Sequence, residues 1–341
     1  MKKLHWFPKT LGVLFIAGIL LISVAYTFKI TQHYKLSAFQ QITGDHYLIH
    51  LDAQECGIDI EGKLKQKSLY EETIDEAQDK RIIHINGIAS HHVGEFPNEG
   101  NPNTIHEHEW TFSVPLHPKM AAQTTSGKGF DTGVLFSGVT IDPFTGEFFI
   151  ASNGLTNHEW NITTLNSLEN LGLDCNNAHV QPGGKYHYHG TPSAYLQELG
   201  ADGLAMLKVG YAADGFPIYY KYGYNENGEL VANESGYHLK KGLRPGDGKS
   251  APDGHFNGLY FNDYEYIEGT SALDACNGRW GRTPENEKEY YYLITDNFPS
   301  VPLCFAGTPS RELQKQRPPV GRAERPPHPP KSGERHPHPR F

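Results

Sequence analysis

Glycine and proline interrupt the middle of this 341-residue chain every few residues, with 36 Gly and 23 Pro in total. That density exceeds what a helix bundle needs, because proline removes a backbone donor and glycine weakens a helix interior. The 19 Tyr and 17 Phe favour strands and turns instead. We therefore predict a mainly β fold, in which a single β-rich domain forms a sandwich or a distorted barrel with a few short helices.

The two ends of the chain differ in composition from its middle. Lysines precede an apolar run at 11–25, which is the pattern of a signal peptide, and the apolar residues that follow make an uncleaved membrane anchor the alternative. We assign 1–35 to this signal peptide or anchor, 36–310 to the β-rich domain and 311–341 to a disordered tail rich in Pro, Arg and His. Export would place the protein in the periplasm, outside the cell, or on the outward face of the inner membrane.

The net charge of the chain limits the kinds of partner that it can bind. The chain carries a formal net charge of -9, and both of its ends are cationic, so the middle is more acidic than that figure suggests. An acidic domain repels the phosphate backbone, which excludes nucleic acid as a partner. A small molecule or a metal ion is the expected partner.

Residue alternation and turn residues locate the expected elements. The turn at 142–146 contains Pro and Gly and predicts a hairpin between the strands on either side of it. The expected helices lie at 70–80, 164–171 and 193–199. The expected strands lie at 81–85, 110–114, 133–141, 147–151, 218–222, 260–267 and 290–295.

The tetrad Tyr186-His187-Tyr188-His189 is the most informative motif. In an extended segment both histidines point to one face and both tyrosines to the other, and the glycines at 183–184 permit a tight return that brings His179 alongside. Three imidazoles with an open position are typical of catalytic zinc, and imidazole also suits copper. We therefore predict a transition metal ion, Cu or Zn, on His179, His187 and His189. The alternative is a set of half-buried strand histidines that bond to backbone carbonyls.

Further motifs extend the pattern beyond the tetrad. They include Asn86-Gly-Ile, Gly94-Glu-Phe-Pro-Asn, Val209-Gly-Tyr-Ala-Ala-Asp-Gly-Phe-Pro-Ile-Tyr, Leu273-Asp-Ala-Cys-Asn-Gly-Arg and Cys304-Phe-Ala-Gly-Thr-Pro. Together they resemble the YHYH-domain family over roughly residues 82–309. Members of that family look like exported bacterial proteins without an established activity, so the resemblance implies a compartment and no mechanism.

The resemblance also implies roles for individual residues. His179, His187 and His189 match the family pattern directly, and His91 is implied as a fourth metal ligand. Asp174 is expected to orient a ligand imidazole. The four cysteines of an exported chain suggest disulfides. Cys276 and Cys304 lie in family-like motifs, which implies that they pair with each other and leaves Cys56 and Cys175 as the second pair.

Three functional classes stay open at the level of sequence. The first is a metal-binding protein, and the second is a metal-dependent hydrolase or oxidoreductase acting on a small extracytoplasmic substrate. Asp214 and Asp263 are the candidate acid or base groups for the second class. The third is an adhesion or scaffold module that needs no metal. The Gly-x-Ser-x-Gly motif of serine hydrolases and the glycine-rich phosphate loops are absent from the sequence.

Overall fold

The computed structural model describes residues 55–164 and 171–315. The expected signal peptide or anchor, nearly all of the expected helix at 164–171 and most of the expected tail lie outside these residues. Within them, no helix combines the length and the apolar composition that crossing a lipid bilayer requires.

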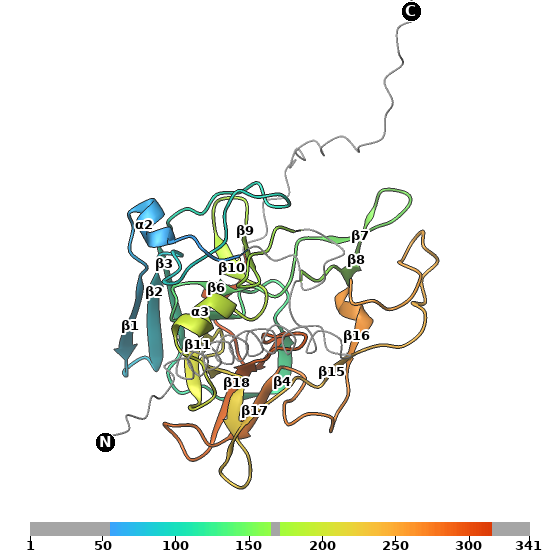
Figure 1. Ribbon diagram of the computed structural model, residues 1–341. Coiled ribbons are helices and arrows are strands. Elements are labelled where there is room, and N and C mark those ends of the chain that lie inside the picture. Colours follow the sequence, from blue (N-terminus) through green and yellow to red (C-terminus); the bar gives the residue numbers. More distant parts are fainter. Residues whose placement is uncertain (1–54, 165–170, 316–341) are drawn as a thin grey trace, which may run out of the picture.

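The largest sheet in the described part of the chain has eight strands and runs through the centre of the fold (Figure 1). Its order is β17 (Gly278–Gly281), β18 (Glu289–Ile294), β12 (Pro217–Tyr220), β11 (Leu207–Ala212), β5 (Gly133–Leu135), β6 (Thr140–Ile141), β10 (Tyr186–Tyr188) and β9 (Ala178–Val180). The pairs β12–β18 and β6–β10 are parallel, and the other neighbours are antiparallel. The prediction of a β-rich domain is confirmed, and the sheets do not close into a barrel.

A three-stranded antiparallel sheet lies at one side, formed by β1 (Tyr70–Asp75), β2 (Lys80–Ile85) and β3 (Trp110–Pro115) (Figure 1). The helix predicted at 70–80 is wrong, because its first six residues form β1 and pair with β2. Acidic residues in β1 face solvent, as an edge strand permits, while Tyr70 packs edge-on against Phe136. Pairing with the neighbouring strand overrides the local helical composition.

Four two-stranded sheets complete the strand set of the described residues. They are β4 (Met120–Ser126) with β19 (Cys304–Gly307), β7 (Phe148–Ile150) with β8 (Thr156–Asn161), β13 (Tyr222–Tyr224) with β14 (Leu230–Ala232), and β15 (Tyr237–Leu239) with β16 (Tyr264–Tyr266).

The single strand predicted at 133–141 is in fact the antiparallel pair β5–β6. Gly138 makes the turn between these two strands at φ 79°, and a Cβ there would lie 2.9 Å from a backbone oxygen. The predicted hairpin across 142–146 is wrong as well, because β6 pairs with β5 and β10, whereas β7 pairs with β8.

Short helices connect the sheets. They are α2 (Ile60–Leu64), α3 (Ser193–Glu198), and the 3₁₀ turns η2 (Phe261–Asp263) and η3 (Arg311–Leu313). The helix predicted at 193–199 is thereby confirmed. The sequence predicts that residues 311–315 belong to the tail, but Leu313 is buried and its carbonyl accepts from the Asp131 amide at 2.9 Å. These residues therefore belong to the fold.

The main apolar core lies against one face of the large sheet. Ala178, Val180, Tyr186, Tyr188 and Ile141 all belong to it and are at most 1 % exposed. Full burial of one large apolar side chain stabilises a fold by about 1.5–3 kcal/mol. Because strand side chains alternate, the residues between these core positions point to the opposite face. One face of β9 and β10 is thus packed in the core, and their other face carries the histidines.

Candidate metal centre

The β9–β10 hairpin places two histidines opposite each other. His179 in β9 is the direct cross-strand partner of His187 in β10. The chain returns between the strands through Gly183 and Gly184, whose φ angles are 99° and 91°, a region that favours glycine. A Cβ on Gly184 would lie 2.4 Å from the His106 ring, so this turn also has no room for a side chain. The sequence thus creates the pair through a glycine turn between two short strands.

His189 supplies the third imidazole from the same strand face. It follows His187 by two residues, and its backbone amide donates to the Asn177 carbonyl at 2.8 Å, which extends the hairpin by one pair. The Nε2 atoms of His187 and His189 are 2.9 Å apart, and those of His189 and His179 are 3.1 Å apart. The three nitrogens all lie within 4.8 Å of one another. The predicted triad is therefore brought together by the fold.

Backbone contacts determine which nitrogen carries the proton in two of the three rings. The Nδ1 of His179 lies 2.8 Å from the Leu171 carbonyl, and the Nδ1 of His187 lies 3.3 Å from the Lys185 carbonyl. A carbonyl only accepts, so each of these Nδ1 atoms carries the hydrogen and leaves a lone pair on Nε2. The Nε2 lone pairs of His179 and His187 consequently both face the Nε2 of His189, which lies within hydrogen-bond distance of each.

Burial keeps the three rings neutral. It lowers the pKa of His179, and it lowers the pKa values of His187 and His189 well below the ordinary range. The other histidines of the triad and the charges of Lys185 and Lys315 act in the same direction on His187. The neutral imidazole is the form that binds a metal ion.

The donor set fits a transition metal. Three imidazole nitrogens that leave further positions open match the ligand pattern of zinc, and imidazole also suits copper and nickel. Calcium and magnesium require oxygen ligands, which this triad does not offer. His187 and His189 are buried and His179 is half-buried, so the His179 side is the more open one.

Comparison with known proteins agrees with this motif. The family model described as "YHYH protein" matches residues 111–307, more than half of the chain. The chain belongs to the YHYH family. The match includes all three histidines of the triad and excludes His91. No curated protein and no solved structure matches the chain.

His91 does not join the triad of this YHYH-family chain, so its predicted role as a fourth ligand is corrected. Its Nε2 accepts from the Tyr188 hydroxyl at 2.5 Å, and its Nδ1 donates to the His92 carbonyl at 2.8 Å. The Ser137 hydroxyl lies 2.8 Å from the same tyrosine oxygen. Tyr188 points to the core face, away from the triad. Both nitrogens of His91 therefore form hydrogen bonds on the side of β10 opposite to the triad. Burial lowers the pKa of His91 to about 4.

Asp174 also lies with the tyrosines of the tetrad and not with its histidines. Its carboxylate accepts from the Tyr186 hydroxyl at 2.6 Å and from the Gly94 amide at 2.9 Å. The expectation that it orients a ligand imidazole is therefore corrected. Burial raises the pKa of Asp174 to about 6, although these hydrogen bonds oppose the rise. In the described structure, Asp174 accepts hydrogen bonds from buried donors on the core side of the hairpin.

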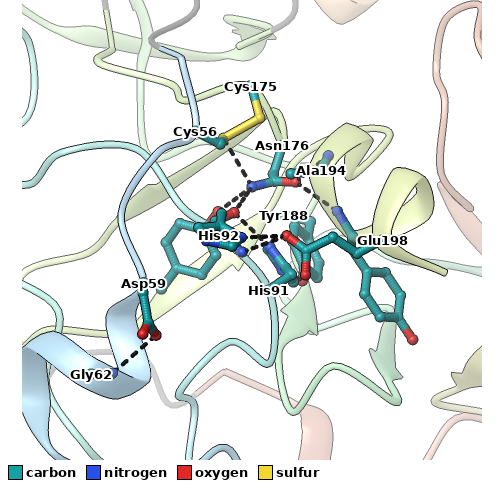
Figure 2. A network of polar contacts seen from close by, with 12 residues as sticks. Cys56, Asp59, Gly62, His91, His92, Cys175, Asn176, Tyr188, Ala194 and Glu198 are labelled. Carbon is teal, nitrogen blue, oxygen red and sulfur yellow. Dashed lines mark hydrogen bonds and ion pairs between the residues drawn. A yellow bond between two sulfur atoms is a disulfide. The ribbon is translucent and has the colours of Figure 1, made fainter.

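A polar network beside these groups connects the hairpin to the start of the described chain (Figure 2). The Asn176 side-chain amide donates to the His92 carbonyl at 3.0 Å and to the Cys56 sulfur at 3.2 Å. Both predicted disulfides are present, Cys56–Cys175 and Cys276–Cys304. The first bond closes a separation of 119 residues and anchors the segment before α2 next to the tetrad.

The two candidate catalytic acids are placed in other contacts. Asp214 accepts from the Tyr292 hydroxyl at 2.6 Å and from the Gly307 amide at 2.8 Å. Both oxygens of Asp263 accept from the Arg244 guanidinium, at 2.8 and 2.7 Å. Neither carboxylate belongs to the group around the triad. Their positions fit turn and loop stabilisation.

Sequence reasoning missed the charged residues that do lie next to the triad. Asp142 follows β6 directly, and its backbone amide donates to the Tyr188 carbonyl at 2.8 Å. Its buried carboxylate pairs with Lys315 and accepts from Gln181 at 3.1 Å. The sequence pattern indicates Asp142 only as the first residue of a turn. The signal for this contact is the parallel pairing of β6 with β10, which joins residues 47 positions apart.

Proposed function

We propose that this YHYH-family protein binds a transition metal ion, Cu or Zn, through His179, His187 and His189 outside the cytoplasm. The observation that carries the proposal is the convergence of three Nε2 atoms within 4.8 Å. The Nε2 lone pairs of His179 and His187 both face the Nε2 of His189. A cation at that point would take the place of the hydrogen between these nitrogens and be bound by all three rings. Waters or a substrate would complete the coordination.

Copper and zinc are the ions that this donor set favours. For divalent ions on nitrogen ligands, affinity rises along the first transition row to Cu²⁺ and is lower again for Zn²⁺. The triad offers imidazole alone, without thiolate or carboxylate. We therefore expect Cu²⁺ to bind more tightly than Zn²⁺, and the ion bound in the cell to depend on availability in its compartment.

An oxidising compartment is consistent with the covalent structure. The four cysteines of the chain form two disulfides. Such bonds persist in the periplasm and outside the cell and are rare in the cytosol. The N-terminal sequence pattern supports export by a signal peptide or an anchor. The proposal thus combines an exported protein with a histidine metal site.

Metal titration tests the proposal directly. Purified protein is stripped with a chelator, titrated with Cu²⁺ and with Zn²⁺, and followed by calorimetry. We expect one tight site, and an affinity reduced at least about hundredfold in His187→Ala and His189→Ala, more than the loss typical of a group behind a ligand. His158→Ala, which removes an exposed histidine on β8, is the control and should keep the parent affinity. Equal affinity in all three variants would refute the triad as the site.

Metal-dependent catalysis is the second candidate, and the open coordination positions favour it. A bound ion can polarise a substrate or activate a water molecule there. Asp142 directly follows β6, the strand that pairs with β10, so it replaces Asp214 and Asp263 as the candidate base. A screen of small hydrolysable and oxidisable substrates, with and without chelator, distinguishes an enzyme from a binding protein. A stable protein that takes up neither ion would instead favour a scaffold role.

A further inference from the structure

The triad shares its sheet face with other polar side chains. In the parallel pair of β6 and β10, Thr140 lies directly beside His187. Asp142 follows Thr140 by two residues, and Lys185 precedes His187 by two, so both lie on that face as well. Thr140 and Asp142 are each 1 % exposed. A buried, polar surface thus surrounds the histidines.

Two ion pairs carry the charges of this surface. Lys185 Nζ lies 2.5 Å from Asp131 Oδ2, and Lys315 pairs with Asp142. Each pair is neutral as a whole, so together they leave the surface without net charge. A divalent ion on three neutral imidazoles would therefore add two uncompensated positive charges. Burial makes such an excess costly unless an anion accompanies the ion.

Hydrogen-bond donors also predominate on this surface. An ammonium group has three N–H donors, and the described residues provide Lys185 and Lys315 with one carboxylate each. The Thr140 hydroxyl is buried and has no hydrogen-bond partner in the described part of the chain. Asp131 Oδ1 is an acceptor on this surface that is likewise buried without a hydrogen-bond partner among the described residues. A ligand that mainly accepts hydrogen bonds would satisfy these groups.

We propose that this surface, made by Thr140, Asp142, Lys185, Lys315 and Asp131, binds a small oxyanion next to the metal ion. The inference rests on the proposed function, because the ion supplies the charge that the anion balances. The oxygens of a carboxylate or a phosphate accept from the two ammonium groups and from the Thr140 hydroxyl. Charge-assisted bonds of this kind are about twice as strong as neutral ones. The substrate or co-ligand of the centre is therefore a small molecule that bears a carboxylate or a phosphate.

Anion titration of the metal-loaded protein tests this inference. Wild-type protein is first titrated with Zn²⁺ alone, freed of excess ion, and then titrated with inorganic phosphate and, separately, with acetate. We expect at least one of the two anions to bind at least about tenfold more tightly to the loaded than to the metal-free protein. Phosphate alone would indicate a tetrahedral ligand, and acetate a carboxylate. Binding of neither anion would overturn the inference.

Variants locate the anion. Lys185→Gln and Lys315→Gln should each weaken anion binding about tenfold, equivalent to one charge-assisted bond, while Zn²⁺ still binds. Lys208→Gln is the matched control, since Lys208 makes a similar half-buried ion pair with Glu285 at 2.8 Å on β11. Thr140→Val keeps the shape of the side chain and should weaken anion binding severalfold, even where a lysine variant folds poorly. Unchanged anion affinity in Thr140→Val and in the folded lysine variants overturns the inference. A failure of Zn²⁺ uptake, seen in the first titration, refutes the proposed function instead.

Discussion

His187 and His189 are neighbours on one strand face, and their Nε2 atoms lie 2.9 Å apart. Side chains two residues apart on a strand need not touch, since their Cα atoms are separated by about 6.6 Å. Here both rings turn toward the same point, and His179 joins them from the adjacent strand at 3.1 Å. The segment 187–189 thus provides a preformed pair of candidate ligands, and the hairpin turn adds the third.

A preformed site predicts that metal stabilises the folded protein. At a free ion concentration about 100 times the dissociation constant, binding adds about 2.7 kcal/mol to the free energy of unfolding. Denaturant unfolding of the wild type with Zn²⁺ and with chelator should show this difference. His189→Ala should unfold at nearly the same denaturant concentration in both conditions. A metal effect of equal size in that variant would place the ion elsewhere.

The tyrosines of the tetrad should affect stability and not metal affinity. Tyr188→Phe leaves the buried His91 Nε2 and the Ser137 hydroxyl without their shared partner, which should lower the free energy of unfolding by about 1–3 kcal/mol. Tyr291→Phe is the matched control, because the Tyr291 hydroxyl is buried with no hydrogen-bond partner in the described residues. That change should be neutral or stabilising. A loss of metal affinity in Tyr188→Phe, with the fold intact, would contradict the division of the two faces.

Asp214 should make stability depend on pH. Burial raises its pKa to about 6 in the folded protein, against about 3.9 in an unfolded chain. Its contribution to stability is therefore fully present below about pH 4 and is lost as the pH rises through about 6. The difference of about 2 pKa units corresponds to about 3 kcal/mol.

The variant Asp214→Asn removes this titration while it keeps an oxygen acceptor for Tyr292 and Gly307. Relative to the wild type, its free energy of unfolding should rise by about 3 kcal/mol between pH 4 and pH 7. Urea unfolding at four pH values in that range measures the difference between the two proteins. A constant difference across the range would show that Asp214 has the same pKa in both states.

The two disulfides should contribute unequally to stability. Cys56–Cys175 joins residues 119 positions apart, and Cys276–Cys304 joins residues 28 apart. In the chain-entropy model, the longer loop stabilises by about 5 kcal/mol and the shorter by about 3.5 kcal/mol. Paired Cys→Ser variants of each bond, compared by denaturant unfolding, should follow this order. The reverse order would mean that local contacts outweigh the restriction of the unfolded chain.

The local sequence was sufficient to predict that the three histidines of the triad lie together. The two-residue period of Tyr186-His187-Tyr188-His189 separates histidines from tyrosines on any extended strand, whatever the rest of the fold does. Gly183 and Gly184 mark the return that brings His179 alongside, because few other residues adopt their positive φ angles. The β-rich class followed in the same way from glycine, proline and aromatic content.

The residues that surround the triad could not be predicted from the local sequence, because contacts between distant segments of the chain decide them. His91 lies on the tyrosine face because its ring bonds to Tyr188, 97 residues away, and no local pattern encodes that contact. Asp142 reaches the triad only through the parallel pairing of β6 with β10, and Lys315 reaches Asp142 from 173 residues further along the chain. The segment 70–75 became a strand for the same reason, since β2 provides its backbone partners.

The sequence by itself therefore determined the β-rich class and the three histidines of the site, since both depend on short periods and turn residues. Only the tertiary structure decided which charged groups stand beside the triad and that His91 and Asp174 serve the core. The physical reason is that strand pairing is set by packing and backbone hydrogen bonds between distant segments. A side chain's neighbours across a sheet are consequently a property of the assembled fold.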